Sequence, residues 1–221
     1  MKTFVSLLFC SLFCLSMVSA QGGFGFLDIS YATINEDFID RTSEGFGNPE
    51  LQLNENGIGI GGSGLFIIQK FVVGGGGGLV VVNSDNSNVS MNIGHGYGFA
   101  GWDFSSNESM IVAASLRLGT FGNTLKIDVP ESNAYTFGTS VLEPGATELT
   151  SGSFSFGIQV DVIKTFEIAP GLAVGLTAYY NAPISALTWQ LNEADIAGLE
   201  QGEYNHYGLT LKIGGGAFNR R

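Results

Sequence analysis

The chain has little cysteine, proline or charge. Its two cysteines, Cys10 and Cys14, both lie in an apolar N-terminal segment, so the rest of the chain has no thiol with which to form a disulfide. There are 5 prolines, and 13% of the residues are charged, about half the usual share. These values exclude a disulfide-stapled scaffold, a collagen-like repeat, a coiled coil and a disordered acidic tail. The 33 glycines lie within apolar stretches, which indicates a folded domain rather than a linker.

The first 20 residues have the pattern of a secretory signal peptide. Lys2 precedes an apolar run from Phe4 to Val18, and Val18-Ser19-Ala20 supplies the small-x-small pattern of a cleavage site. The run, about 15 residues, is shorter than the roughly 20 that a membrane-spanning helix needs. We therefore expect residues 1–20 to be cleaved and residues 21–221 to form one exported domain. Loss of Lys2 changes the formal net charge from −11 to −12, which makes nucleic acid a poor partner.

Apolar residues alternate with small or polar residues in eight segments. Residues of one parity face the same side of a strand. In Ser153–Ile163, the clearest case, large apolar residues occupy the even positions. In the fourth segment the odd residues from Val89 to Phe99, His95 included, are predicted to face outward. Helical periodicity is limited to Asn192–Glu200. The eight predicted strands are Leu27–Ala32, Gly57–Ile68, Phe71–Asn83, Val89–Trp102, Met110–Gly119 with an extension toward Ile127 left open, Ser153–Ile163, Leu172–Asn181 and Tyr204–Ile213.

The predicted connections are short at one end and mostly long at the other. Gln69–Lys70 is a two-residue turn, whereas Asp128–Gly152 and Ala182–Glu203 are long loops. Antiparallel strands of about ten residues with this asymmetry are typical of outer-membrane barrels, in which closure leaves no unpaired strand edge in hydrocarbon. We predict an all-β fold, an eight-stranded antiparallel up-and-down transmembrane β-barrel, with the short turns and both termini in the periplasm. A soluble periplasmic sandwich or lipocalin-like barrel is the alternative.

Small residues at the inward positions predict a lumen filled by side chains. The glycine run Gly74–Gly78 either lets the wall bend or lets an aromatic ring lie against the backbone. Aromatic residues near the strand ends predict interfacial belts. The belt residues are Phe24, Phe26, Phe66, Phe71, Trp102, Phe104 and Phe166 at the periplasmic rim, and Tyr31, Phe121, Phe154, Phe156, Tyr180 and Tyr204 at the outer rim.

Four ionisable residues are predicted to face the lumen: Asp28, Arg117, Asp161 and Lys212. A charge in a narrow lumen is costly unless it is paired. Because their strands are neighbours in the closed barrel, we predict the pairs Asp28–Lys212 and Arg117–Asp161. We interpret them as a structural polar plug rather than as a proton or ion gate.

Catalytic and metal-binding patterns are weak. His95 and His206 are isolated, so no metal site and no cofactor is predicted. Ser140, Ser151 and Ser153 have no general base at a convincing spacing, so the chain is predicted not to be an enzyme. The outer loops are acidic and could bridge through calcium, but we favour a solvated rim.

The pattern resembles the small eight-stranded outer-membrane barrels of the OmpA and OmpX type. It resembles more closely the outer membrane β-barrel domain proteins of the Bacteroidota, whose exported chains often begin with Gln after Ala, as at Ala20-Gln21. The last strand, Tyr207–Ile213, looks like the signal that the barrel-assembly machinery reads, which implies recognition of Gly208, Leu211 and Ile213. Such strands usually end the chain, whereas Gly214–Arg221 follow here, so either the strand is longer or the signal is internal.

The resemblance implies a monomeric, non-enzymatic protein of a Gram-negative outer membrane. Its expected partners are outer-membrane lipid, lipopolysaccharide and the barrel-assembly machinery, and its expected role is envelope integrity or surface interaction. Two alternatives stay open: a narrow channel or small-solute transporter, and a soluble periplasmic lipid carrier.

Overall fold

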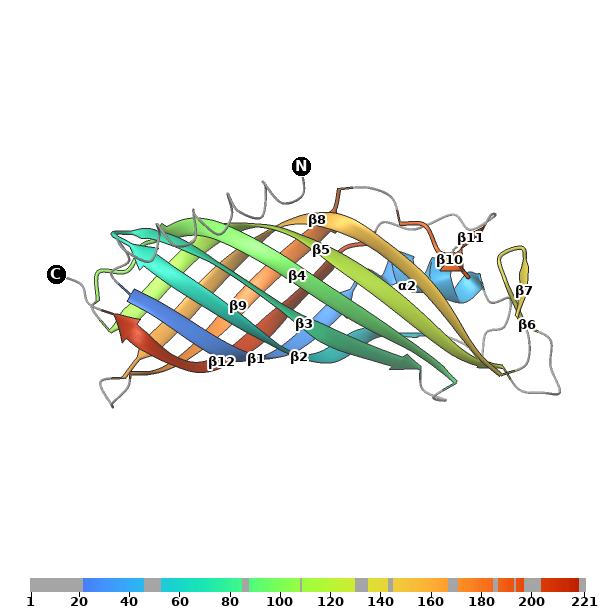
Figure 1. Ribbon diagram of the computed structural model, residues 1–221, viewed down its shortest axis with the longest axis horizontal. Helices are drawn as coiled ribbons and strands as arrows, with labels where there is room; N and C mark the ends of the chain where they lie inside the picture. The colour runs from blue at the N-terminus through green and yellow to red at the C-terminus, as the bar shows by residue number, and fades with distance from the viewer. Residues whose placement is uncertain are drawn as a thin grey trace.

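The computed structural model is a closed barrel of eight long antiparallel strands, strongly tilted against the barrel axis (Figure 1). It describes residues 22–45, 53–84, 88–107, 109–129, 135–142, 145–166, 171–184, 187–192, 194–196 and 204–218. The predicted signal peptide and its cleavage site lie outside these residues. The barrel strands are β1 (Gly22–Ile34), β2 (Leu53–Ile68), β3 (Phe71–Ser84), β4 (Val89–Asp103), β5 (Met110–Val129), β8 (Gly145–Thr165), β9 (Leu172–Pro183) and β12 (His206–Phe218).

Closure follows from the strand register. Each barrel strand pairs with its neighbour in sequence, β1 pairs with β12, and the β8–β9 ladder completes the ring. Cross-strand partners followed once around the barrel, starting at Phe154 of β8, lead back to Lys164 of the same strand, ten residues further on. Such a stagger is what tilts the strands of a closed barrel. The predicted fold class is therefore confirmed.

Several predicted connections are partly strand. β5 and β8 pair as far as Val129 and Gly145, so much of the predicted loop Asp128–Gly152 belongs to the barrel wall. β12 pairs with β1 as far as Phe218, which shows that the last strand is longer than predicted. Gly22 and Phe218 pair at the end that carries the short turns.

The helix predicted over Asn192–Glu200 is wrong where the structure describes it. Around Asn192 the described residues form a small hairpin of β10 (Gln190–Leu191) and β11 (Ala194–Asp195), and residues 193 and 197–200 lie outside the described part. A helix that was not predicted, α2 (Glu36–Glu44), lies between β1 and β2. Asn35 caps it by accepting a hydrogen bond from the Asp37 amide at 2.9 Å, and acidic residues in the first turn favour the helix dipole. Among the described helices none is long and apolar enough to cross a membrane.

The predicted facing of the side chains is confirmed on seven strands and wrong on β4. On β8, Phe154 is 66% exposed, whereas its inward neighbours Ser153 and Ser155 are buried. On β4 the odd residues face the lumen, among them Val89, Phe99 and Asp103. Asp103 gives a physical reason, because its buried carboxylate accepts hydrogen bonds from Ser105 and the Val112 amide, and a lipid-facing position would leave it unsolvated.

Large apolar side chains fill both ends of the lumen, so the prediction of a mostly glycine, serine and alanine interior was wrong. Four predicted belt residues, Phe24, Phe26, Phe121 and Tyr204, are buried inside, whereas the other belt residues are exposed or half-buried. The turn-end cluster comprises Phe24, Phe26, Leu65, Ile67, Val72, Phe99, Ile111, Ala113, Ile163 and Ala173. The loop-end cluster includes Phe38 and Ile39 of α2 together with Ile34, Val82, Met91, Phe121, Leu125, Phe137, Leu149, Trp189 and Tyr204.

Aromatic rings lie against the glycine run of β3. A Cβ atom at Gly74 would lie 2.5 Å from Cζ of Phe99, and one at Gly76 would lie 2.8 Å from the Tyr97 hydroxyl. The expectation that an aromatic ring lies against the backbone of this run is therefore confirmed. Only glycine leaves room for these rings at the inner wall.

Candidate functional site

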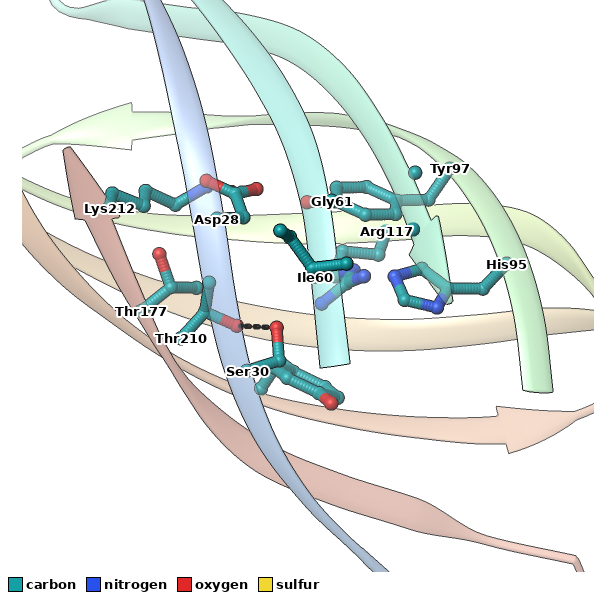
Figure 2. A pocket seen from close by; sticks show the side chains of 13 residues that line it. Asp28, Ser30, Ile60, Gly61, His95, Tyr97, Arg117, Thr177, Thr210 and Lys212 are labelled. Atoms are coloured by element: carbon teal, nitrogen blue, oxygen red, sulfur yellow. Dashed lines mark hydrogen bonds and ion pairs between the residues drawn. The ribbon is translucent and has the colours of Figure 1, made fainter. Parts of the chain in front are cut away.

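A polar layer occupies the lumen between the two apolar clusters. Each of its charged side chains comes from a different strand: Asp28 from β1, Arg117 from β5, Asp161 from β8 and Lys212 from β12, and all are at most 5% exposed. Figure 2 shows Asp28, Arg117 and Lys212 with Tyr97 and His95 around one space. The alternation of each strand is what points these residues inward.

Asp28 and Lys212 are brought together. They are direct cross-strand partners of β1 and β12, and Lys212 Nζ lies 3.4 Å from Asp28 Oδ2. Lys212 Nζ also donates a hydrogen bond to Ser63 Oγ at 2.6 Å and lies 5.6 Å from the centre of the Phe26 ring. The pairing gives each buried charge the partner that it needs in a medium of low dielectric constant.

Arg117 and Asp161 are not brought together, so the second predicted pair was wrong. The Arg117 guanidinium lies between two aromatic rings, 3.7 Å from the centre of Tyr97 and 4.7 Å from that of Tyr179. Asp161 accepts hydrogen bonds from Gln159 Nε2 at 2.6 Å and from Thr177 Oγ1 at 2.5 Å. The adjacency of β5 and β8 is not enough to bring the two side chains together, because Arg117 lies opposite Gly157, four residues from Asp161 on β8.

Two residues of the polar layer are missed by the sequence analysis because the predicted facing of β4 was wrong. The alternation of β4 predicts that Tyr97 and His95 face lipid, whereas both line the lumen. The available signal was the shared parity of His95 with Asp103, since two polar side chains on one face of a strand argue against contact with lipid.

Neutral hydrogen bonds join the strands within the polar layer and among the loop-end cluster. Ser30 and Thr210 join β1 to β12 at 3.0 Å, Asn123 donates to Ser151 at 3.2 Å, and Asn181 contacts His206 Nε2 at 3.0 Å. These bonds tie neighbouring strands together from the inside. Among the described residues, no group of three His, Cys, Asp or Glu side chains could hold a metal ion.

The three residues of the predicted assembly signal do not share one face of β12. Leu211 and Ile213 are 36% and 43% exposed on the outer wall. Gly208 is an inward position, where a Cβ atom would lie 2.8 Å from the Tyr179 hydroxyl. Recognition of these residues by the assembly machinery stays a prediction.

The loop end is closed by α2 and aromatic rings. Phe38 packs edge-on against Tyr204 with ring centres 4.8 Å apart, Tyr204 stacks on Phe121 at 4.5 Å, and Trp189 lies edge-on to Phe137 at 6.2 Å. Burial raises the pKa of the Tyr204 hydroxyl. Beside this end β7 (Ser140–Leu142), β8 and β10 border a groove of about 470 Å³.

The fold defines a class, the small eight-stranded β-barrels known from outer membranes. Neisserial surface protein A has 11% sequence identity over 87% of this chain and 96% of its own, with a TM-score of 0.52, which shows a shared fold. Ail of Yersinia pestis matches at 16% identity, 88% and 99% coverage and a TM-score of 0.46. The outer-membrane protein AlkL matches at 10% identity, 90% and 92% coverage and a TM-score of 0.45.

No protein-family model matches the chain. No curated protein sequence matches it either. The resemblance to the Bacteroidota family therefore stays a prediction, and the structural likeness carries the fold alone.

Proposed function

We propose that this protein is an integral outer-membrane barrel with a filled lumen, without enzymatic activity, that acts from its loop end in envelope integrity or surface interaction. The observation that supports this proposal most strongly is the apolar outer surface of the barrel. Its outward residues include Phe154, Leu118, Ile158 and Leu209, which are 53% to 66% exposed. An apolar surface of this extent is rare on a soluble monomer and is the normal lipid-facing band of a membrane barrel.

The height of this band fits a bilayer. On β8 every second residue from Phe154 to Val162 is large, apolar and exposed, and these nine residues match the 9–11 that a tilted strand needs to cross hydrocarbon. Six residues before Phe154, Glu148 pairs with Lys126 at 2.8 Å, and both side chains are about half exposed. The β5–β8 wall would therefore extend beyond the bilayer at the loop end.

The three-layered lumen supports a structural rather than a conducting role. Apolar clusters fill both ends, and an ion crossing the barrel would have to leave water at each of them. The polar layer between them is cross-linked by an ion pair and hydrogen bonds. This arrangement favours the polar plug over the ion gate.

The loop end is where partners would bind. It carries α2, β6 (Tyr135–Phe137), β7, β10 and β11 (Figure 1), and the groove beside Leu142 and Leu191 has a volume in the range of small-molecule sites. Lipopolysaccharide and outer-membrane lipid are the proposed surroundings of a monomeric barrel. Export through residues 1–20 and insertion by the barrel-assembly machinery are the proposed route.

Two measurements on the full chain test this function. Fractionation of the producing cells should recover the protein in detergent-extracted outer membrane, and its gel migration should differ between boiled and unboiled samples. Recovery in periplasm without detergent would contradict the proposal and favour the lipid carrier. In a planar bilayer the protein should give no steady current, and a stable single-channel conductance would favour the channel.

A further inference from the structure

A small cavity lies in the middle of the polar layer. Asp28, Tyr97, Arg117 and the backbone of Gly61 and Gly78 contribute to its wall, and Figure 2 shows the first three side chains pointing toward a common space. About 10 Å³ is open to the centre of a water molecule, close to the roughly 10–15 Å³ that one bound water needs. The size therefore suits a single small ligand.

Three buried side-chain atoms of the residues around this cavity have no hydrogen-bond partner among the described residues: Asp28 Oδ1, His95 Nδ1 and Arg117 Nε. Asp28 is 5% exposed and Arg117 is 4% exposed. A carboxylate oxygen only accepts hydrogen bonds, and the Nε–H of arginine only donates. Buried groups of this kind are costly when unsatisfied, so the set calls for a ligand that both accepts and donates.

We propose that the cavity binds one water molecule. The water accepts a hydrogen bond from Arg117 Nε and donates to Asp28 Oδ1 and to His95 Nδ1, with the histidine proton on Nε2. Three hydrogen bonds are the usual number for a buried water. The bound water extends the Lys212–Asp28 ion pair to Arg117, so that one continuous network joins β12, β1 and β5 across the lumen.

Charge favours water over a small anion. The four described charges of the polar layer, Asp28, Asp161, Arg117 and Lys212, already balance, and the buried Asp103 carboxylate toward the turn end adds a further negative charge. An added halide would bring one more buried negative charge without a cation of its own, which is costly. A halide would also face Asp28 Oδ1 and the lone pair of His95 without a proton to give them, whereas water has two.

A crystal structure of the full chain at high resolution, with a second crystal soaked in bromide, tests the site directly. The expected result is one density peak within hydrogen-bond distance of all three atoms and no anomalous signal there after the soak. A site without density would overturn the proposal. An anomalous bromide peak would also overturn it and would identify an anion site.

A double-mutant cycle tests the network independently. Asp28→Asn and Arg117→Met should each lower the melting temperature of the refolded chain, and the double variant should lose at least about 3 °C less than the two losses combined. The matched control pairs Arg117→Met with Asp103→Asn, because the buried Asp103 carboxylate is bonded to Ser105 and the Val112 amide at the turn end and lies apart from Arg117. Additive losses in both cycles would contradict the bridge.

Discussion

At the scale of single residues, the two cations of the polar layer are held in different ways. Lys212 has a carboxylate partner at 3.4 Å, while Arg117 lies between the faces of Tyr97 and Tyr179. The planar guanidinium suits such stacking, and the compact ammonium of lysine does not. The sequence could predict that these charges face inward, because parity decides it. It could not predict how Arg117 is held, because that depends on the register and on the facing of β4.

Removal of Lys212 should be strongly destabilising. Lys212→Met leaves Asp28 charged and buried, and loss of one partner of a buried pair typically costs about 3–5 kcal/mol. The matched control is Lys126→Met, because Lys126 pairs with Glu148 on the exposed wall and such a pair contributes at most about 1 kcal/mol. Urea unfolding of both variants in lipid vesicles measures the difference. Equal losses would show that the lumen pair does not stabilise the barrel.

At the scale of elements, β4 shows where parity alone is ambiguous. Its odd residues run from Val89 to Asp103 and contain large apolar side chains, while its even residues include Gly94, Gly96 and Gly98. A pattern of large against small favours the large face toward lipid. The structure places the large face inward, where Phe99 and Tyr97 fill the space left by the glycines of β3. The facing of β4 therefore depends on its packing against β3, which the sequence of β4 alone does not reveal.

Two glycines on adjacent strands should respond differently to the same substitution. A Cβ atom at Gly76 would lie 2.7 Å from the Ser63 Cβ and 2.8 Å from the Tyr97 hydroxyl, whereas a Cβ atom at Gly96 would meet nothing within 4 Å. Gly76→Ala should therefore cost about 1–3 kcal/mol through overpacking. Gly96→Ala should be neutral or stabilising by up to about 1 kcal/mol. Unfolding in vesicles measures both, and a comparable loss at Gly96 would contradict the assigned facing of β4.

The elements outside the barrel ladder were the least predictable. α2 is nine residues long, and its buried residues Phe38 and Ile39 pack on residues from several distant segments. A short segment with a polar cap and two apolar residues gives a weak signal, because tertiary packing provides most of the stability of a short helix. The extension of β5 and β8 was hidden for another reason, since beyond the apolar band their outer faces are polar, as at Lys126 and Glu148.

At the scale of the whole molecule, closure of the barrel and its outward apolar band both suit a wall that lies in hydrocarbon. Within the apolar band the ring of eight strands leaves no strand edge unpaired, so the wall would need no hydrogen bonds from surrounding hydrocarbon. Eight recurrences of the two-residue period and the alternating loop lengths were sufficient to predict this architecture. The contents of the lumen were less predictable, because aromatic residues such as Phe24 and Phe121 serve equally well at a rim or inside.

A charge placed on the outer wall should show the membrane depth of the band. Ile158 lies near the middle of the apolar stretch of β8 and is 53% exposed. Ile158→Arg should cost about 2–4 kcal/mol, the usual penalty near the midplane, whereas Thr124→Arg, beyond the band on β5, should cost about 0–1 kcal/mol. Folding titrations into vesicles compare the two. Equal penalties would place both positions in the same medium.

The most direct test is to measure whether lipid or water touches the outer wall of the barrel. The chain beyond residue 20 has no cysteine, so single cysteines at Phe156, Ile158 and Val160 can carry spin labels in protein reconstituted into bilayers, with Glu148 as the aqueous control. We predict high collision rates with oxygen and low rates with a water-soluble nickel complex at the three β8 sites, and the reverse at Glu148. Collision rates with the nickel complex at the β8 sites equal to those at Glu148 would contradict a lipid-facing wall.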